Sequence, residues 1–211
     1  WLRQACGHRA FVLGALLTLG LLGAAALSYL WTPASPFEMN LDAKLQGPSL
    51  AHWLGTDAYG RDVASLLLVG ARSSILVGII AVGIGLTLGT ALGLLAAARR
   101  GWIEELVMRL ADFTFAFPAI LSAIMLTAVF GAGIVNAIIA IGVFTIPTFA
   151  RVTRASANGV WARDYVLAAR ACGKSRWQIT WEHVLPNIRS VLIVQATIQF
   201  ALAILAEAAL S

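Results

Sequence analysis

Few residues of this chain have the types and the spacing that catalysis, metal binding or phosphate binding requires. The three histidines are His8, His52 and His183, which lie far apart in the sequence without metal-ligand spacing. His52 with Asp57 and Asp62 could hold a metal ion, but turn and helix-cap roles suit these aspartates better. Gly173-Lys174-Ser175 completes no phosphate-binding loop, because Ala168 stands where that loop has its first glycine. We therefore expect no catalytic residue, no metal site and no cofactor bound by this chain.

Several residues are unusual for the apolar segments that contain them. Glu207 is the one acidic residue of the last apolar segment, and it is either a polar contact near an outer gate or an interfacial residue. Pro118 and Pro147 would kink apolar helices, either as plain architecture or to shape a translocation path. Glycines recur at four-residue spacing at Gly85, Gly89 and Gly93. This spacing allows close approach by another helix, from the same subunit or from a partner.

The composition of the chain indicates a membrane protein. Apolar residues make up 60% and charged residues 12% of its 211 residues. An ordinary soluble domain has about 45–50% apolar and about 25% charged residues. So little charge cannot cover a water-soluble globule, which excludes a soluble enzyme and a nucleic-acid-binding protein. The net charge of +5 then reflects the membrane topology and requires no nucleic-acid partner.

Long stretches without any charged residue predict the membrane spans. They are 10–37, 73–98, 113–150 and 190–206. A spanning helix needs about 20 apolar residues, and these stretches lack the alternating pattern of barrel strands. The third stretch is about twice as long as one span needs, with a hairpin expected at Gly131-Ala132-Gly133. The sequence therefore predicts an all-α polytopic membrane protein with five spans. The predicted spans are 10–31, 73–98, 113–131, 133–150 and 189–210.

The positions of lysine and arginine predict the orientation of these spans. Most of the fifteen lie in 1–9, 99–112 and 151–189. The others are Lys44, Arg61 and Arg72. By the positive-inside rule, the three richer segments are cytoplasmic. The N-terminus is then cytoplasmic and 32–72 lies outside.

The segment 151–189 has the local signals of two short helices with a sharp break between them. Trp161–Cys172 is rich in good helix formers, and Gly173 is the kind of residue that ends a helix. Ser175 and Gln178 form a capping-box pattern that starts a second helix. Pro186 is expected to stop that helix. On composition alone, this segment would be a structured connector on the membrane surface.

The order of these residues resembles the EAA loop of ABC-importer permeases. The loop's pattern appears as Ala168-Ala169, Gly173 and Leu185-Pro186. Further matching segments occur in order along the chain from about residue 50. They are His52-Trp53-Leu54-Gly55-Thr56-Asp57, Gly60-Arg61-Asp62, Gly70-Ala71-Arg72, Phe117-Pro118, Gly131-Ala132-Gly133, Ala150-Arg151, Arg154, Asp164-Tyr165, His183-Val184-Leu185-Pro186-Asn187 and Ala206-Glu207-Ala208. The ordered set resembles the C-type permease subunit of dipeptide, oligopeptide and nickel importers.

This resemblance implies a type I ABC importer permease fold in the cytoplasmic membrane of a prokaryote. The expected parts are the first helix within 1–31, an outer loop at 32–72 and a permease core at 73–211. The partners implied are a homologous second permease, two ATPase subunits that hold ATP and magnesium, an extracytoplasmic binding protein and the lipid bilayer. The implied cargo is a short peptide. The alternatives are nickel, glutathione or another small solute, and, from another class, an ATP-independent transporter or channel.

The resemblance also implies which residues couple ATP hydrolysis to transport. The first helix of the loop would dock in a cleft of an ATPase subunit, with Ala168 and Ala169 allowing close approach. Gly173 would fix the angle to the exit helix, and Tyr165 would be a buried anchor. The implied contacts at the rim are Arg163, Asp164 and Arg170, and Ser175, Leu185 and Pro186 would set the geometry of the loop.

Two features depart from the family pattern. Leu167 stands where the general motif has glutamate, so no acid–base contact with the ATPase is expected at that position. The family also continues into an outer loop and a sixth helix, which we therefore expect beyond Ser211.

Overall fold

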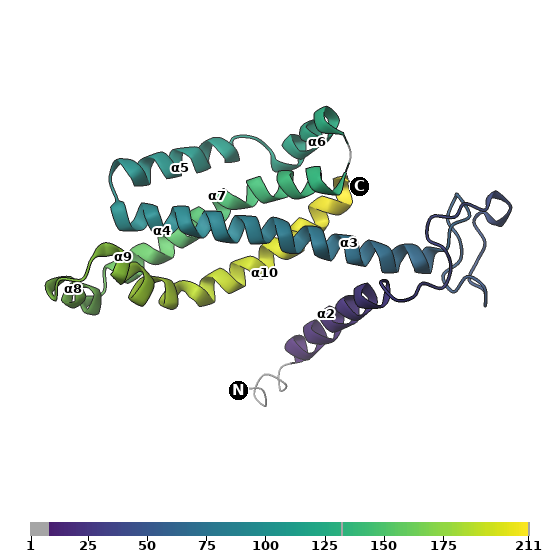
Figure 1. Ribbon diagram of the computed structural model, residues 1–211, viewed down its shortest axis with the longest axis horizontal. Coiled ribbons are helices and arrows are strands. Elements are labelled where there is room, and N and C mark those ends of the chain that lie inside the picture. The colour runs from purple at the N-terminus through teal and green to yellow at the C-terminus, as the bar shows by residue number, and fades with distance from the viewer. Residues whose placement is uncertain (1–8, 132, 211) are drawn as a thin grey trace. The chain divides into compact units, whose positions relative to one another are not determined.

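The computed structural model describes residues 9–131 and 133–210. These residues are helical or irregular, and the one pairing of β type among them is an isolated bridge between Thr56 and Asp62. The chain divides into two compact units, one ending at Leu76 and one beginning at Val77 (Figure 1). The predicted all-α class is confirmed for the described residues.

The first unit begins with helix α2, Arg9–Leu27. Its alanines and leucines are strong helix formers, and Ala25 is the one residue of the helix that is buried. The helix gives way to turns at Ser28, whose hydroxyl donates to the Ala25 carbonyl at 2.7 Å. A helix that is apolar on all sides and almost wholly exposed suits a lipid environment. It corresponds to the predicted first span.

The segment after α2 is a loop fixed by hydrogen bonds, with a short 3-10 turn at Leu41–Ala43. Asp57 accepts from the Tyr59 and Arg61 amides at 2.8 and 2.9 Å and so closes a turn. Asp62 accepts from the Ser65 amide and hydroxyl at 2.8 and 2.7 Å, which caps the next helix. Burial raises the pKa of Asp62, but the hydrogen bonds from Ser65 and His52 outweigh it and leave this pKa below its usual value. The expected turn and cap roles of these aspartates are confirmed.

Helix α3, Val63–Ile84, begins at this cap, about ten residues before the span predicted at 73–98. It continues through a π-helical segment, Gly85–Gly89, into α4, Thr90–Arg99. The whole stretch Val63–Arg99 is one 37-residue helix apolar enough to cross a membrane. The loop predicted to end at residue 72 therefore ends at Asp62.

The predicted third span, 113–131, is wrong as a single helix. Helix α5, Trp102–Phe115, already starts in a segment that was expected to be cytoplasmic, and α6 covers Ala119–Phe130. Between them lies Pro118, which has no amide hydrogen and forces the residue before it out of helical geometry. The 12 residues of α6 reach about 18 Å, less than the ~30 Å hydrocarbon core. Pro118 therefore breaks this segment completely, where only a kink was expected.

Helix α7, Ile134–Trp161, includes the predicted fourth span and extends eleven residues beyond its predicted end at residue 150. Pro147 lies inside this helix without ending it. Much of the expected surface loop 151–189 is therefore a continuation of two long helices.

The chain then forms α8, Asp164–Ala171, and α9, Arg176–Ile179. A π-helical turn, Thr180–Val184, joins α9 to α10, Leu185–Leu210. The expectation that Pro186 stops the second helix is wrong, because Arg176–Ala209 is one continuous helix. The wide turn shifts the bonding pattern just before the proline, with the Leu185 amide donating to the Thr180 carbonyl five residues earlier. The missing amide of Pro186 is therefore tolerated.

Four helices of the described residues are long and apolar enough to cross a membrane. They are α2, α3–α4, α7 and α9–α10, and they contain four of the five predicted spans. Within the second unit, α4, α5 and α7 pack against one another and α10 packs on α7 (Figure 1). The turn from α4 to α5 lies at the same end of this unit as α8, and α6 lies at the other end.

Candidate functional site

Helix α8 is the centre of the candidate coupling site, and its ends are sharply defined. Arg163, in extended geometry, separates it from α7. Gly173 has a φ of +83°, a left-handed conformation that favours glycine, and so ends the helix. Ser175 and Gln178 form the full capping box that starts α9. The predicted helix, break and second start are confirmed, with α8 shorter than the expected Trp161–Cys172.

The two alanines of the motif differ in burial. Ala169 is 9% exposed and belongs, with the fully buried Val166, to the apolar core of its own chain. Ala168 is exposed, beside Tyr165 and Leu167, which are 46% and 51% exposed. Ala169 therefore fixes α8 in place, whereas Ala168 and Tyr165 lie on the surface that another protein could reach.

Side chains of α8 also bind it to the helices on either side. The Arg170 guanidinium lies 5.0 Å from the centre of the Trp161 ring at the end of α7. The rings of Tyr165 and His183 meet edge to face, 6.0 Å apart. Movement of α8 is therefore linked to α7 on one side and to the π-helical turn before α10 on the other.

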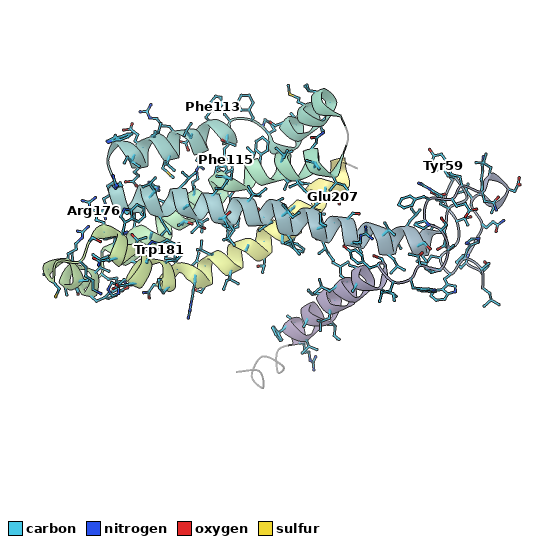
Figure 2. The ribbon with its side chains drawn as sticks, viewed as in Figure 1. Tyr59, Phe113, Phe115, Arg176, Trp181 and Glu207 are labelled. Carbon is cyan, nitrogen blue, oxygen red and sulfur yellow. The ribbon has the colours of Figure 1, made fainter. Side chains whose placement is uncertain are left out.

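A further contact that the sequence motif does not indicate joins α9 to α4. The Arg176 guanidinium donates to the Ala98 carbonyl at 2.8 Å and to the Arg99 carbonyl at 3.2 Å (Figure 2). These are free carbonyls at the end of α4, where a positive charge is also favoured by the helix dipole. No sequence signal pointed to this role, because it joins residues almost eighty positions apart.

The glycine stripe packs inside the subunit, which decides between the two alternatives that the sequence left open. A Cβ atom at Gly89 would lie 2.5 Å from the Ile146 carbonyl oxygen and 2.6 Å from Cβ of Phe149. In the same way, a Cβ atom at Gly85 would meet Thr145, and one at Gly93 would meet Ala150 and Thr153. All three glycines therefore seat the helix from α3 to α4 on α7.

Ion pairs connect α5 to α7, and sequence analysis did not identify them. The Arg154 guanidinium donates to Glu104 at 2.8 Å. Arg151 pairs with Asp112, and its guanidinium lies 4.4 Å from the centre of the Phe115 ring. Sequence analysis assigned these arginines and acids to separate cytoplasmic segments.

The candidate gate residues are not gathered into one site. Pro118 is the residue before α6, and Pro147 is buried within α7. Glu207 lies near the end of α10, at the end of the second unit opposite α8 (Figure 2). No common pathway role follows from these three positions.

Comparison with known proteins decides the family. Residues 89–211 match the family described as the binding-protein-dependent transport system inner membrane component. The glutathione transport system permease protein of Pectobacterium atrosepticum is 37% identical over 211 residues, covering 100% of this chain and 70% of that protein. The chain belongs to this family of transport permeases. The resemblance inferred from the sequence is confirmed.

Two further relatives of this permease carry related names. The dipeptide transport system permease protein of Alkalihalophilus pseudofirmus is 38% identical over 208 residues, covering 99% of this chain and 68% of that protein. The glutathione transport system permease protein of Escherichia coli O157:H7 is 40% identical over 213 positions, covering 100% and 70%. The permease is therefore a multi-pass membrane protein of a transport family whose relatives are named as membrane permeases.

Proposed function

We propose that this permease is one of two membrane subunits of an ATP-driven importer for short peptides. Its partners are a homologous permease, two ATPase subunits that bind ATP and magnesium, and an extracytoplasmic binding protein. Support for peptide as the cargo comes from the relative named for dipeptide transport. Relatives named for glutathione transport support a second candidate, glutathione, which is itself a small peptide with charged ends.

The observation that carries the coupling role is the build of α8. It is a short helix whose buried side is fixed to its own chain and whose other side exposes Tyr165, Leu167 and Ala168. The small side chain of Ala168 would allow a partner surface to approach closely. A tyrosine that becomes buried under a partner, as Tyr165 would, is a frequent anchor of interfaces. Arg163, Asp164 and Arg170 lie on the exposed part of this segment and form its polar rim.

The importer assembled in liposomes with its partner subunits provides the test of this function. Uptake of a dipeptide, of glutathione and of nickel distinguishes the candidate cargoes. ATP-dependent uptake of a dipeptide or glutathione supports the proposal, and uptake of nickel alone contradicts it.

The coupling role of α8 is tested with Ala168→Asp. A charge placed on a closely packed docking surface costs at least the roughly 1–3 kcal/mol of overpacking. We therefore expect peptide uptake and substrate-stimulated ATPase activity to fall about tenfold or more, with membrane insertion intact. Ala51→Asp, the same change at an exposed position of the outer loop, is the matched control and should leave both activities unchanged. Equal activity of the two variants would show that α8 is only a connector.

A further inference from the structure

Helix α5 presents two different stripes on its exposed side. Val107 and Ala111 are buried against the rest of the second unit. Glu105, Arg109 and Asp112 recur at four- and three-residue spacing, which places them in one charged stripe. Beside it runs an exposed apolar stripe. The apolar stripe contains Leu106, Leu110 and Phe113, and the exposed Phe117 follows the end of the helix. Figure 2 shows Phe113 on the outer side of α5 and Phe115 nearer to α7.

The charged stripe lies beside a helix that is long enough to span a membrane. Helix α5 packs beside α7 (Figure 1), and ion pairs connect the two helices at Glu104–Arg154 and Asp112–Arg151. The 28 residues of α7 measure about 42 Å, more than the ~30 Å hydrocarbon core. Arg151 is ten residues from the Trp161 end, or about 15 Å along the helix. The charges of α5 thus lie beside a spanning helix and not on a surface loop.

Within the subunit, the charged side chains of this stripe and of Arg151 are exposed. The side chains of Asp112 and Arg151 are 65% and 43% exposed, and those of Glu105 and Arg109 are 61% and 76% exposed. Charged groups at membrane depth face water or protein, because facing lipid costs several kcal/mol each. Since Glu105 pairs with Arg109 and Asp112 with Arg151, they need no charges from another subunit. If a partner subunit buried these charges, removing them from water would cost a desolvation penalty. Charges that face a water-filled path avoid this penalty.

We propose that the charged stripe of α5, with Arg151 of α7, lines the water-filled translocation path, and that Asp112 and Arg151 form a transit site for zwitterionic peptides. The peptide ammonium binds Asp112, and its carboxylate binds Arg151, whose guanidinium matches a carboxylate in a two-bond fork. An exposed ion pair is worth only about 0–1 kcal/mol, so the peptide termini replace it at little cost. Weak binding suits a path, because cargo must also leave. This assignment rests on the proposed peptide transport.

Thiol accessibility tests the lining of the path. Arg109→Cys and its neighbour Leu106→Cys are compared in the assembled complex in nanodiscs, with Cys6 and Cys172 replaced by serine. The probe is a charged methanethiosulfonate reagent, which modifies thiols in water. We expect it to modify Arg109→Cys roughly tenfold faster than Leu106→Cys. Equal rates at the two positions would overturn the assignment. Slow reaction at both would also overturn it and would indicate that a partner covers the stripe. Glu105→Cys replaces Arg109→Cys if that variant fails to assemble.

Protection by a peptide tests the transit site. Dialanine should slow the reaction of Arg109→Cys about twofold or more, whereas N-acetyl-dialanine amide, which has no charged ends, should not. Arg151→Gln in the same background should abolish the protection. Protection by neither compound, or by both equally, would refute the transit site. These measurements use neither ATP nor uptake, so their failure is distinct from a failure of the complex to transport peptides.

Discussion

Neighbouring residues of the coupling motif have different roles. Ala168 and Ala169 are equivalent in the sequence pattern, yet one is exposed and the other lies in the core. Gly173 was predictable, because few residues other than glycine adopt the φ of +83° that ends α8. The direction of each alanine was not predictable, because it depends on which face of α8 meets the rest of the chain.

Arg176 offers a test at the scale of one residue. Arg176→Gln removes the positive charge and the paired donors that satisfy the Ala98 and Arg99 carbonyls. Hydrogen bonds that involve a charged group contribute about 1.5–3 kcal/mol, so the variant should unfold at a lower temperature. The purified complex is measured by thermal unfolding, with trypsin cleavage after Arg99 and Arg100 as a local probe. Arg189→Gln, at an exposed position of α10, is the control, and equal destabilisation of both variants would contradict the role of Arg176.

Three prolines show why elements are harder to predict than residues. Pro118 separates α5 from α6, Pro147 lies within α7, and Pro186 follows a π-helical turn in a continuous helix. Each lacks an amide hydrogen, but the result depends on whether packing and neighbouring turns hold the helix together. The sequence could therefore locate the prolines but not distinguish a break from an uninterrupted helix.

The contact of the π-helical segment Gly85–Gly89 with α7 is tested by Gly89→Ala. The added methyl group would lie 2.5 Å from a backbone oxygen of α7, so the two helices must separate. Overpacking of this kind costs about 1–3 kcal/mol, and the unfolding temperature of the complex should fall. Gly83→Ala is the matched control, because nothing lies within 4 Å of the added carbon. It should be neutral or stabilising by about 0.5–1 kcal/mol. If the two variants unfold at the same temperature, the close contact does not stabilise the subunit.

At the scale of the whole molecule, the charge-free stretches located the long helices well. They marked α2, α3–α4, α7 and α10, because a spanning helix must be apolar along its length. They failed at α5, because the charges of Glu104 and Asp112 hid the start of this helix at Trp102. These acids pair with Arg154 and Arg151, and such pairs between distant segments cannot be read from local composition.

The orientation of the permease in the membrane is a further prediction at this scale. Arginines at the α4–α5 turn and around α8 lie at one end of the second unit, and the positive-inside rule would place that end in the cytoplasm. Cys172 is exposed, and it is compared with Ala51→Cys in the loop between α2 and α3. Cys6 is replaced by serine in both proteins, and Cys172 is also replaced by serine in the Ala51→Cys protein. An impermeant thiol reagent added to intact cells should label only the cysteine at position 51. Inverted vesicles should show the reverse, because their cytoplasmic face is exposed. Labelling of Cys172 in intact cells would mean that α8 is outside the cell, where no ATPase could dock on it.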